Sequence, residues 1–557
     1  MVYALAVEVT SAHAAPAAVG PGQAKGMRWI VGWAILILLT IGVIRFHRLD
    51  VPLERDEGEY AYSAQLMLDG TPPFAAAYNM KLPGIYAVYA LILRAFGATT
   101  SGIHFGLLVV NLTTIAALLV LGRRLLGPLG GLCAAATFGV AALDPAVTGL
   151  FANSEHFVVL PLVLGALALL RARESAALLP HALAGLLLGT CFVIKQHGIA
   201  FVLFGAVATL FGCRARSGIA AGATWTRFGV YLASAALPFA AVCIWMASAG
   251  VFPRFWFWTF TYAATYVSQI GFSEGLANLG AQVRHLAGPL LGLWAFGAFG
   301  LIALAWHRAS RPVAPWLAAL ALFSFLATCP GMLFREHYFV LVLPAAGLLA
   351  GLGVVALRSL ALRWLATSWR ASTALAGWAF AIAALAPLGL QNEYLLRLSD
   401  LQVSRFTYGP NPFPEAVLVG DYIRARTKPH ERIAVIGSEP EIYFYADRRA
   451  ATGHIYTYAL MEEHPFAKEM QKEMMAQIET AKPAFVVYVN VPSSWLMRPT
   501  SHPDILKWTP GFLDAHYTQV GLLDIIGLDR TDQFWGADVV GKKPSGVHWL
   551  GIYQRTP

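Results

Sequence analysis

Apolar runs of 13 to 21 residues recur through the first 390 residues of the chain, and short groups of charged residues separate them. Inside a bilayer the backbone has no water to bond to, so a segment that crosses it must be a helix of about 20 mostly apolar residues. Charged residues make up 13% of the chain, whereas a soluble domain usually has about 25%. The sequence therefore predicts a polytopic α-helical membrane protein.

These runs predict about eleven transmembrane helices. They are Trp29–Ile44, Ile103–Leu121, Leu125–Leu143, Phe157–Leu170, Ala182–Ile194, Ile199–Phe211, Phe228–Ala247, Leu286–Trp306, Trp316–Cys329, Phe339–Leu357 and Leu375–Leu390. The two runs that flank Lys195 are the shortest, and the count falls by two if they form one re-entrant hairpin. Residues 1–28 are rich in Ala, Pro and Gly and are predicted to be a disordered cytoplasmic N-terminus. No small-residue cleavage site follows the first run, which predicts an uncleaved anchor.

Basic residues gather at alternate ends of the runs, which indicates the orientation of the helices. A cytoplasmic N-terminus places on the inner side Lys25, Arg28, Arg123, Arg124, Arg171, Arg173, Arg214, Arg216, Arg227, Arg308, Arg311, Arg358, Arg363 and Arg370. Loops rich in Lys and Arg stay in the cytoplasm, so this orientation is predicted. The net charge of +9 is therefore a signal of topology. It does not form the single basic patch that would indicate a nucleic-acid partner.

Three long segments then lie on the outer side. Residues 29–390 are predicted to be the transmembrane domain, with a first outer loop at 45–102 and a second long outer segment at 248–285. Residues 391–557 have the composition of a soluble protein and are predicted to be an exported α/β domain. Its predicted strands are Arg432–Gly437, Phe485–Asn490 and His548–Gln554, and Pro465–Ala481 is its predicted helix.

Charged residues also cluster at the outer ends of the apolar runs. Asp56 and Glu57 belong to a group of five acids in the first outer loop, and the outer edges carry Lys81, Glu155, Lys195 and Arg335. A charge inside a bilayer costs about 2.5–3.5 kcal/mol, so such residues usually face a cavity and mark function. Cations can hold a phosphate there while a carboxylate removes a proton from an acceptor. The alternatives are a solvated acidic loop and a Lys195 that reaches to the membrane surface.

The chain resembles a known family in these segments. Arg55–Ala61 reads RDEGEYA, Lys81–Tyr86 reads KLPGIY, and Arg335–Tyr338 reads REHY ahead of Pro344. They are similar to motifs of the GT-C glycosyltransferases, in the group that contains protein O-mannosyltransferases and the aminoarabinose transferase of lipid A. The resemblance covers roughly residues 29–450. It extends to Tyr443–Tyr445, which is similar to a segment in the exported domains of bacterial members.

The resemblance implies a role for each matching position. Asp56 matches the acid proposed as general base, Glu57 lies beside it, and Glu155 matches a second acid in the next outer loop. The donor phosphate is expected to bind Lys81, Lys195, Arg335 and the Tyr338 of the Arg-x-x-Tyr segment. Two positions depart from the family. Relatives have Pro-Pro after the lysine where this chain has Leu82-Pro83, and many have Asp at the position of Glu155.

The resulting prediction is a glycosyltransferase of the bacterial inner membrane. It would move a sugar from a polyprenyl-phosphate donor to an acceptor hydroxyl on the outer face, with inversion at the anomeric carbon. A glycolipid, a polysaccharide and a protein all remain open as acceptors, and a divalent cation is neither required nor excluded by the spacing of Asp56, Glu155 and His337. A transporter or lipid flippase is the alternative. The charges gather near one face, however, and the chain lacks the two related halves that many transporters have.

Overall fold

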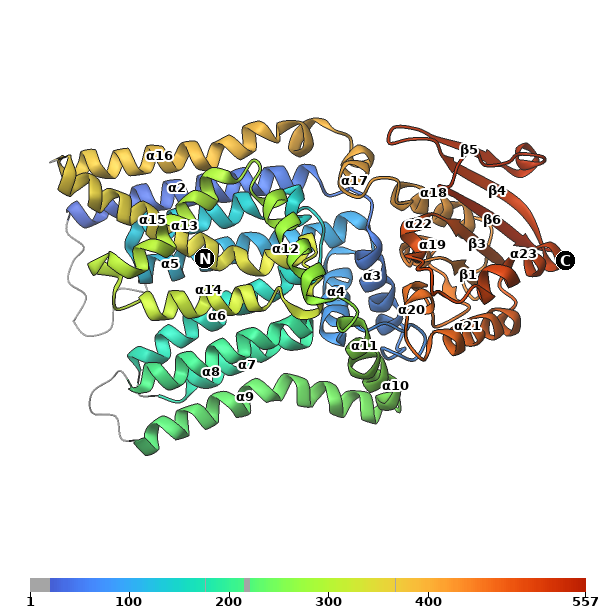
Figure 1. Cartoon of the computed structure of the whole chain (residues 1–557), viewed down its shortest axis with the longest axis horizontal. Helices are drawn as coiled ribbons and strands as arrows, with labels where there is room; N and C mark the ends of the chain where they lie inside the picture. The colour runs from blue at the N-terminus through green and yellow to red at the C-terminus, as the bar shows by residue number, and fades with distance from the viewer. Residues whose placement is uncertain (1–20, 176, 215–220, 366, 557) are drawn as a thin grey trace.

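The computed structural model describes residues 21–175, 177–214, 221–365 and 367–556. A bundle of long helices forms one part of the molecule, and a mixed sheet with its own helices covers one end of the bundle (Figure 1). Of the predicted disordered N-terminus, residues 1–20 lie outside the described residues. Helix α2 (Pro21–His47) begins inside the rest of that segment, because a proline is tolerated in a first helical turn and none follows it here.

All eleven apolar runs are found in ten helices. These helices are α2, α5 (Thr100–Ala141), α6 (Ser154–Glu174), α7 (Leu179–Ile194), α8 (Ile199–Arg214), α9 (Ala221–Ser248), α13 (Leu291–Trp306), α14 (Ala314–Leu326), α15 (Leu343–Trp364) and α16 (Trp369–Leu390). Two of the runs share α5, which is kinked at Gly127, where φ is 80° and Pro128 follows.

Length separates these helices into two groups. Within the described residues, six are long and apolar enough to cross a membrane, or seven when α12 (Phe272–Leu286) and α13, bent by 115°, count as one span. The shorter apolar helices include α7, α8 and α14. The sequence predicted about eleven spans. The difference arises because these three short helices do not reach the roughly 20 residues of a full crossing, and because the two runs that share α5 count as one helix. The predicted class, a helical membrane protein with a C-terminal α/β part, is confirmed.

The segments between the long helices build the end of the bundle that faces the sheet. The first loop folds into α3 (Arg55–Leu68) and α4 (Pro83–Phe96). Helix α3 begins with a capping box, in which the Glu54 side chain accepts from the Glu57 backbone and the Glu57 side chain accepts from the Glu54 backbone. This reciprocal pair satisfies two amide groups that a helix start would otherwise leave unpaired. It fixes where Asp56, the second helical residue, projects.

Short helices complete this end of the bundle. They are η2 (Pro145–Val147), η3 (Gln196–Gly198), α10 (Phe252–Trp256), the π-helix η4 (Phe257–Tyr262), α11 (Ala263–Val267), η6 (Pro330–Met332), η7 (Glu336–Val342) and the π-helix η8 (Glu393–Arg397), whereas η5 (Arg308–Ser310) joins α13 to α14. Most of them are 3-10 or π turns, which change the direction of the chain over a few residues. They place η3 and η7 beside α3 and α4.

The C-terminal part contains a six-stranded sheet in the order β2-β1-β3-β6-β4-β5. Its strands are β1 (Arg432–Ile436), β2 (Arg449–Ala450), β3 (Phe485–Asn490), β4 (Tyr517–Ile525), β5 (Thr531–Trp535) and β6 (Trp549–Arg555). Strand β1 is parallel to β2 and β3, and β6 is antiparallel to β3 and β4. The three predicted strands correspond to β1, β3 and β6. The sequence did not predict β2, β4 or β5.

Helices surround the sheet and connect it to the bundle. They are α17 (Asp400–Tyr408), α18 (Phe413–Arg424), α19 (Glu441–Ala446), α20 (Tyr458–Met461), α21 (Ala467–Ala481), α22 (Pro492–Trp495) and α23 (Asp504–His516), with the turn η9 (Gly536–Val539). Helix α19 packs directly on α3 at Gly58, where an added Cβ would lie 2.5 Å from the backbone nitrogen of Glu441. This close approach brings the C-terminal end of β1 and the loop after β2 over the first-loop helix.

Candidate active site

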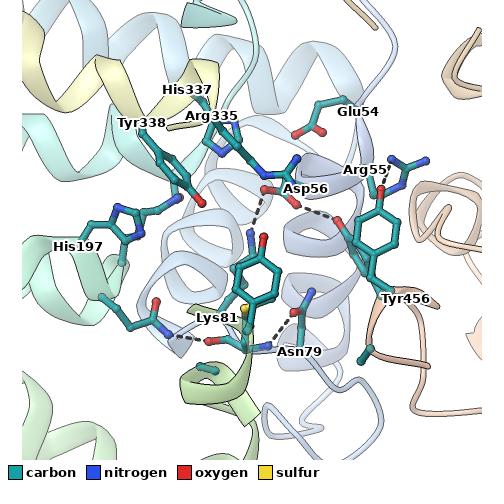
Figure 2. A pocket seen from close by; sticks show the side chains of 18 of the residues that line it. Glu54, Arg55, Asp56, Asn79, Lys81, His197, Arg335, His337, Tyr338 and Tyr456 are labelled. Atoms are coloured by element: carbon teal, nitrogen blue, oxygen red, sulfur yellow. Dashed lines mark hydrogen bonds and ion pairs between the residues drawn. The ribbon is translucent and has the colours of Figure 1, made fainter. Parts of the chain in front are cut away.

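A cavity of about 410 Å³ lies where the helical bundle meets the sheet part (Figure 2). Its walls come from the start of α3, the chain before α4, η3, η7 and the segment that leads into α20. Among the residues that line it are Asp56, Lys81, Lys195, Arg335, His337, Tyr338 and Tyr456. Residues that are hundreds of positions apart in the sequence therefore share one hollow.

Asp56 is held from both sides in this cavity. Its Oδ2 accepts from Lys81 Nζ at 2.9 Å and from the Tyr60 hydroxyl at 3.3 Å. Its Oδ1 accepts from the Tyr456 hydroxyl at 2.8 Å. Burial alone would raise the pKa of Asp56, but the charges of Lys81 and His337 and these hydrogen bonds outweigh it and hold the pKa below its usual range. The carboxylate is thus ionised, oriented and within reach of the cavity.

Lys81 is the cation of this pair. Burial lowers its pKa, but the Asp56 carboxylate and nearby Glu59 outweigh burial, and its pKa is raised. Glu59 is fully buried and accepts from Asn79 Nδ2 at 2.6 Å and the Tyr86 hydroxyl at 2.5 Å. Burial raises the pKa of Glu59 to about 8. Because Asn79 precedes Lys81 by two residues, Glu59 braces the backbone that presents the Lys81 side chain.

Lys195 and Glu155 form a second, deeper ion pair. Lys195 ends α7 and Glu155 starts α6, and Lys195 Nζ donates to a Glu155 oxygen. Nζ also lies 3.3 Å from Ser154 Oγ and 4.7 Å from the ring centre of Tyr338. The Glu155 side chain is completely buried. Lys195 lines the cavity and Glu155 lies behind it, so Glu155 faces Lys195 and the open space does not reach it.

Arg335 and Tyr338 enter the cavity at η7. Tyr338 packs between the rings of His197 and His337, with ring centres 4.6 and 4.9 Å away. Among the described residues, no carboxylate lies within 4.0 Å of the Arg335 guanidinium. A half-buried cation that lines a cavity without an acidic partner favours an anionic ligand. Of the three cations predicted at the site, Arg335 is thus the one without a carboxylate partner in the described structure.

Glu57 points away from the cavity. Its side chain is completely buried and accepts from His104 Nε2 at 2.9 Å and from the backbone nitrogens of Glu54 and Ala152. Adjacent helical residues are separated by about 100° around the helix axis, so Asp56 and Glu57 cannot face the same space. The structure therefore brings Asp56 into the cavity and places Glu57 among groups that fix the start of α3.

The sequence analysis missed the residues that come from the sheet part. Arg55 donates to the Tyr458 hydroxyl at 2.6 Å and to Glu439 Oε1 at 2.8 Å, and Tyr456 donates to Asp56. Tyr456 and Tyr458 form a Tyr-x-Tyr pair, and such a pair is too common in protein sequences to indicate an active site. The tyrosines that the family resemblance picked out have other contacts: the Tyr443 hydroxyl accepts from the Val435 backbone, and the Tyr445 hydroxyl accepts from the Leu53 backbone.

The aromatic segment between α9 and α12 forms another wall of the cavity. Trp258, Tyr262 and Tyr266 line it, on the π-helix η4 and on α11. Tyr262 is anchored to the sheet part through Glu462, to which its hydroxyl donates at 2.5 Å. Aromatic faces pack well against apolar groups, so this wall gives the cavity an apolar side opposite its charged residues.

The side chains around the cavity also decide whether a metal ion could bind there. Within residues 21–175, 177–214, 221–365 and 367–556, no three His, Cys, Asp or Glu side chains come together in a way that could hold a metal ion. Around Asp56 both carboxylate oxygens already accept from protein donors, and the nearest groups are a lysine and tyrosines. Such groups form a poor ligand set for a divalent cation.

No protein-family profile and no curated protein sequence matches this chain. Its structure is similar to ArnT from Cupriavidus metallidurans bound to undecaprenyl phosphate, with a TM-score of 0.55 and 16% identity over 85% of this chain and 95% of that one. Apo ArnT gives the same TM-score and identity over 94% of this chain and 98% of that one. The archaeal oligosaccharyltransferase AglB from Archaeoglobus fulgidus, in complex with an inhibitory peptide and a dolichol-phosphate, aligns with a TM-score of 0.51 and 14% identity over 94% of this chain and 76% of that one. The chain therefore has the GT-C fold, as the first-loop motif predicted.

Proposed function

We propose that this protein is a membrane glycosyltransferase that takes a sugar from a polyprenyl-phosphate donor and transfers it to an acceptor hydroxyl. One observation carries the proposal: a single cavity at the end of the membrane helices combines an oriented carboxylate, Asp56, with Lys81, Lys195 and Arg335. Solved structures of the same fold contain polyprenyl phosphates, namely undecaprenyl phosphate in ArnT and a dolichol-phosphate in AglB.

The cations suit the phosphate of the donor. Arg335 has no carboxylate partner among the described residues, and its planar guanidinium can bind two phosphate oxygens at once. Lys195 is held at the cavity wall by Glu155, and Tyr338 lies against its ammonium group. Such an arrangement stabilises the negative charge that grows on the phosphate as the bond to the sugar breaks. We assign Arg335, Lys195, Lys81 and Tyr338 to the donor phosphate.

Asp56 suits the acceptor side of the reaction. The acceptor oxygen attacks the anomeric carbon, the bond between that carbon and the phosphate oxygen breaks, and the polyprenyl phosphate leaves with the bonding electrons. The acceptor proton passes to Asp56, which acts as general base. A single displacement of this kind inverts the anomeric configuration. Glu155 and Glu57 hold Lys195 and the start of α3, respectively, and thus act through their neighbours.

The setting of the cavity supports the proposed location. The basic residues of the predicted inner segments favour a cytoplasmic N-terminus. We therefore propose that the cavity and the sheet part lie on the outer face of a bacterial inner membrane. The donor chain would then lie among the bundle helices. The acceptor would approach between the bundle and the sheet part, and it would be a glycolipid, a polysaccharide or a protein.

Donor consumption tests the proposal directly. Purified protein is incubated with a panel of polyprenyl-phosphate sugars and candidate acceptors, and release of polyprenyl phosphate is measured. We expect at least one donor to be consumed by the wild type and not by Asp56→Asn. If no donor is consumed while the protein moves intact lipid-linked sugar across vesicle membranes, the protein is a transporter and the proposal is wrong.

A further inference from the structure

We infer that the donor phosphate and Asp56 compete for Lys81, so that donor binding uncovers the base and must precede acceptor binding. The inference rests on the proposed function and adds an order of events to it. It starts from the contacts of Asp56, because each oxygen of the carboxylate that should accept a proton from the substrate already accepts at least one hydrogen bond from the protein in this structure. Lys81 and Tyr60 occupy Oδ2, and Tyr456 occupies Oδ1.

Lys81 is the partner that a ligand can reach. The Lys81 and Asp56 side chains are 19% and 20% exposed, whereas those of Lys195 and Glu155 are 8% and 0% exposed. Both Lys81 and Asp56 line the cavity, so an anion in the cavity meets their ion pair without any unfolding. In the deeper pair of Lys195 and Glu155 the carboxylate is completely buried, so an anion in the cavity is much less able to replace it as the partner of the lysine.

An anion in the cavity has a place to bind before it meets Lys81. Figure 2 shows the side chains of Arg335 and Lys81 directed toward the same space, with Asp56 between them. Arg335 is not paired with any carboxylate in the described part of the chain. A phosphodiester carries one negative charge and becomes a stronger anion as the sugar departs. It can therefore draw the lysine ammonium away from Asp56 while Arg335 holds it.

Loss of Lys81 would change Asp56 in two ways. First, Oδ2 would lose its shorter hydrogen bond and keep only the 3.3 Å one from Tyr60, so it could accept from an acceptor hydroxyl, while Tyr456 continues to orient the carboxylate through Oδ1. Second, the charge of Lys81 is the strongest opposing influence on the buried carboxylate, so its withdrawal makes Asp56 a better proton acceptor. Before the donor binds, Lys81 is paired with Asp56 and hinders a hydrogen bond from the acceptor hydroxyl to the carboxylate. The arrangement thus activates the base only when a phosphate occupies the cavity.

The experiment measures binding of undecaprenyl phosphate to the full-length protein in detergent, without any turnover. Competition predicts that Asp56→Asn, which frees Lys81, binds this probe about tenfold more tightly than the wild type. Asp56→Ala should give the same direction. In a Lys81→Met background, Asp56→Asn should change the affinity by less than about twofold, because no lysine remains to be released.

Glu336→Gln is the matched control. Glu336 lines the same cavity and has no ion-pair partner among the described residues, so its loss changes the charge of the cavity without releasing a cation. We expect a much smaller effect than that of Asp56→Asn. If the wild type binds the probe and both Asp56→Asn and Asp56→Ala bind it no more tightly than the wild type, the inference is wrong but the proposed function stands. The same holds if Glu336→Gln increases the affinity as much as Asp56→Asn does. If neither the wild type nor any variant binds the probe, the proposed function fails as well.

Discussion

Replacement of Lys195 by methionine should destabilise the whole protein, apart from any effect on catalysis. Glu155 is completely buried, and its principal partner is Lys195. Without that ammonium group, the contacts of Glu155 among the described residues are with Ser154 Oγ at 3.2 Å and with His337 Nε2 at 3.9 Å. Removal of one partner of a buried ion pair typically costs about 3–5 kcal/mol. Because two weak partners remain, we expect a loss near the lower end, about 3 kcal/mol.

The companion variants show where this free energy comes from. Lys195→Met combined with Glu155→Gln should lie within about 1 kcal/mol of the wild type, because no uncompensated charge remains. Glu155→Gln alone should cost less than Lys195→Met alone, since Lys195 lines the cavity and can turn its charge toward it. Lys81→Met is the control at the more exposed pair, whose side chains are 19% and 20% exposed. It should cost about 1 kcal/mol or less.

The assay is unfolding of the detergent-purified full-length protein, followed by tryptophan fluorescence. The four variants and the wild type are compared in the same detergent, so that differences between them are more reliable than the absolute values. The reasoning is refuted if Lys195→Met is as stable as the wild type, or if Lys81→Met is destabilised just as much. Either result would mean that burial of Glu155 does not set the cost.

Three further predictions concern catalysis and topology. Asp56→Asn should lower transfer by about 10²–10⁴-fold without loss of stability, and near-normal turnover would remove Asp56 as the base. Tyr456→Phe removes a hydrogen bond to a carboxylate whose pKa is lowered, so that pKa rises and the acidic limb of the pH–rate profile should move to higher pH by about one unit; an unmoved limb with a lower rate would indicate a purely structural role. Reporters fused after Arg124 and after Pro557 should lie on opposite sides of the membrane, and the same side for both would reverse the proposed orientation.

Much of the architecture follows from hydropathy alone. Most of each apolar run predicted from the sequence lies in a helix, because in lipid only a helix can satisfy the backbone of such a segment. The strands β1 and β3 were also recognisable, since buried parallel strands read as continuous apolar runs. Strands β4 and β5 were not recognised, because β4 is interrupted by a shift of register between Gln519 and Gly521 and β5 has no buried residue, so neither has the regular pattern of a strand.

The residue types at the candidate site were also visible in the sequence. Asp56, Lys81, Lys195 and Arg335 stood out because they cluster on the outer side, and charges placed in or against a membrane usually face a cavity and mark function. Their pairing did not stand out. That Lys81 pairs with Asp56, Lys195 with Glu155, and Arg335 with no carboxylate among the described residues depends on how the helices pack.

The sequence by itself thus determined the membrane-spanning class of the chain and the kinds of side chain near its site. Tertiary structure decided which side chains face the cavity and what each contacts. Tyr456 lies 400 positions from Asp56 and donates to it, a relation with no local sequence signal. Glu57 is adjacent to Asp56 but does not line the cavity, because the capping box sets the rotation of α3. Hydropathy depends only on local composition, whereas a hydrogen bond requires two groups within about 3 Å, and only the packed fold sets that distance.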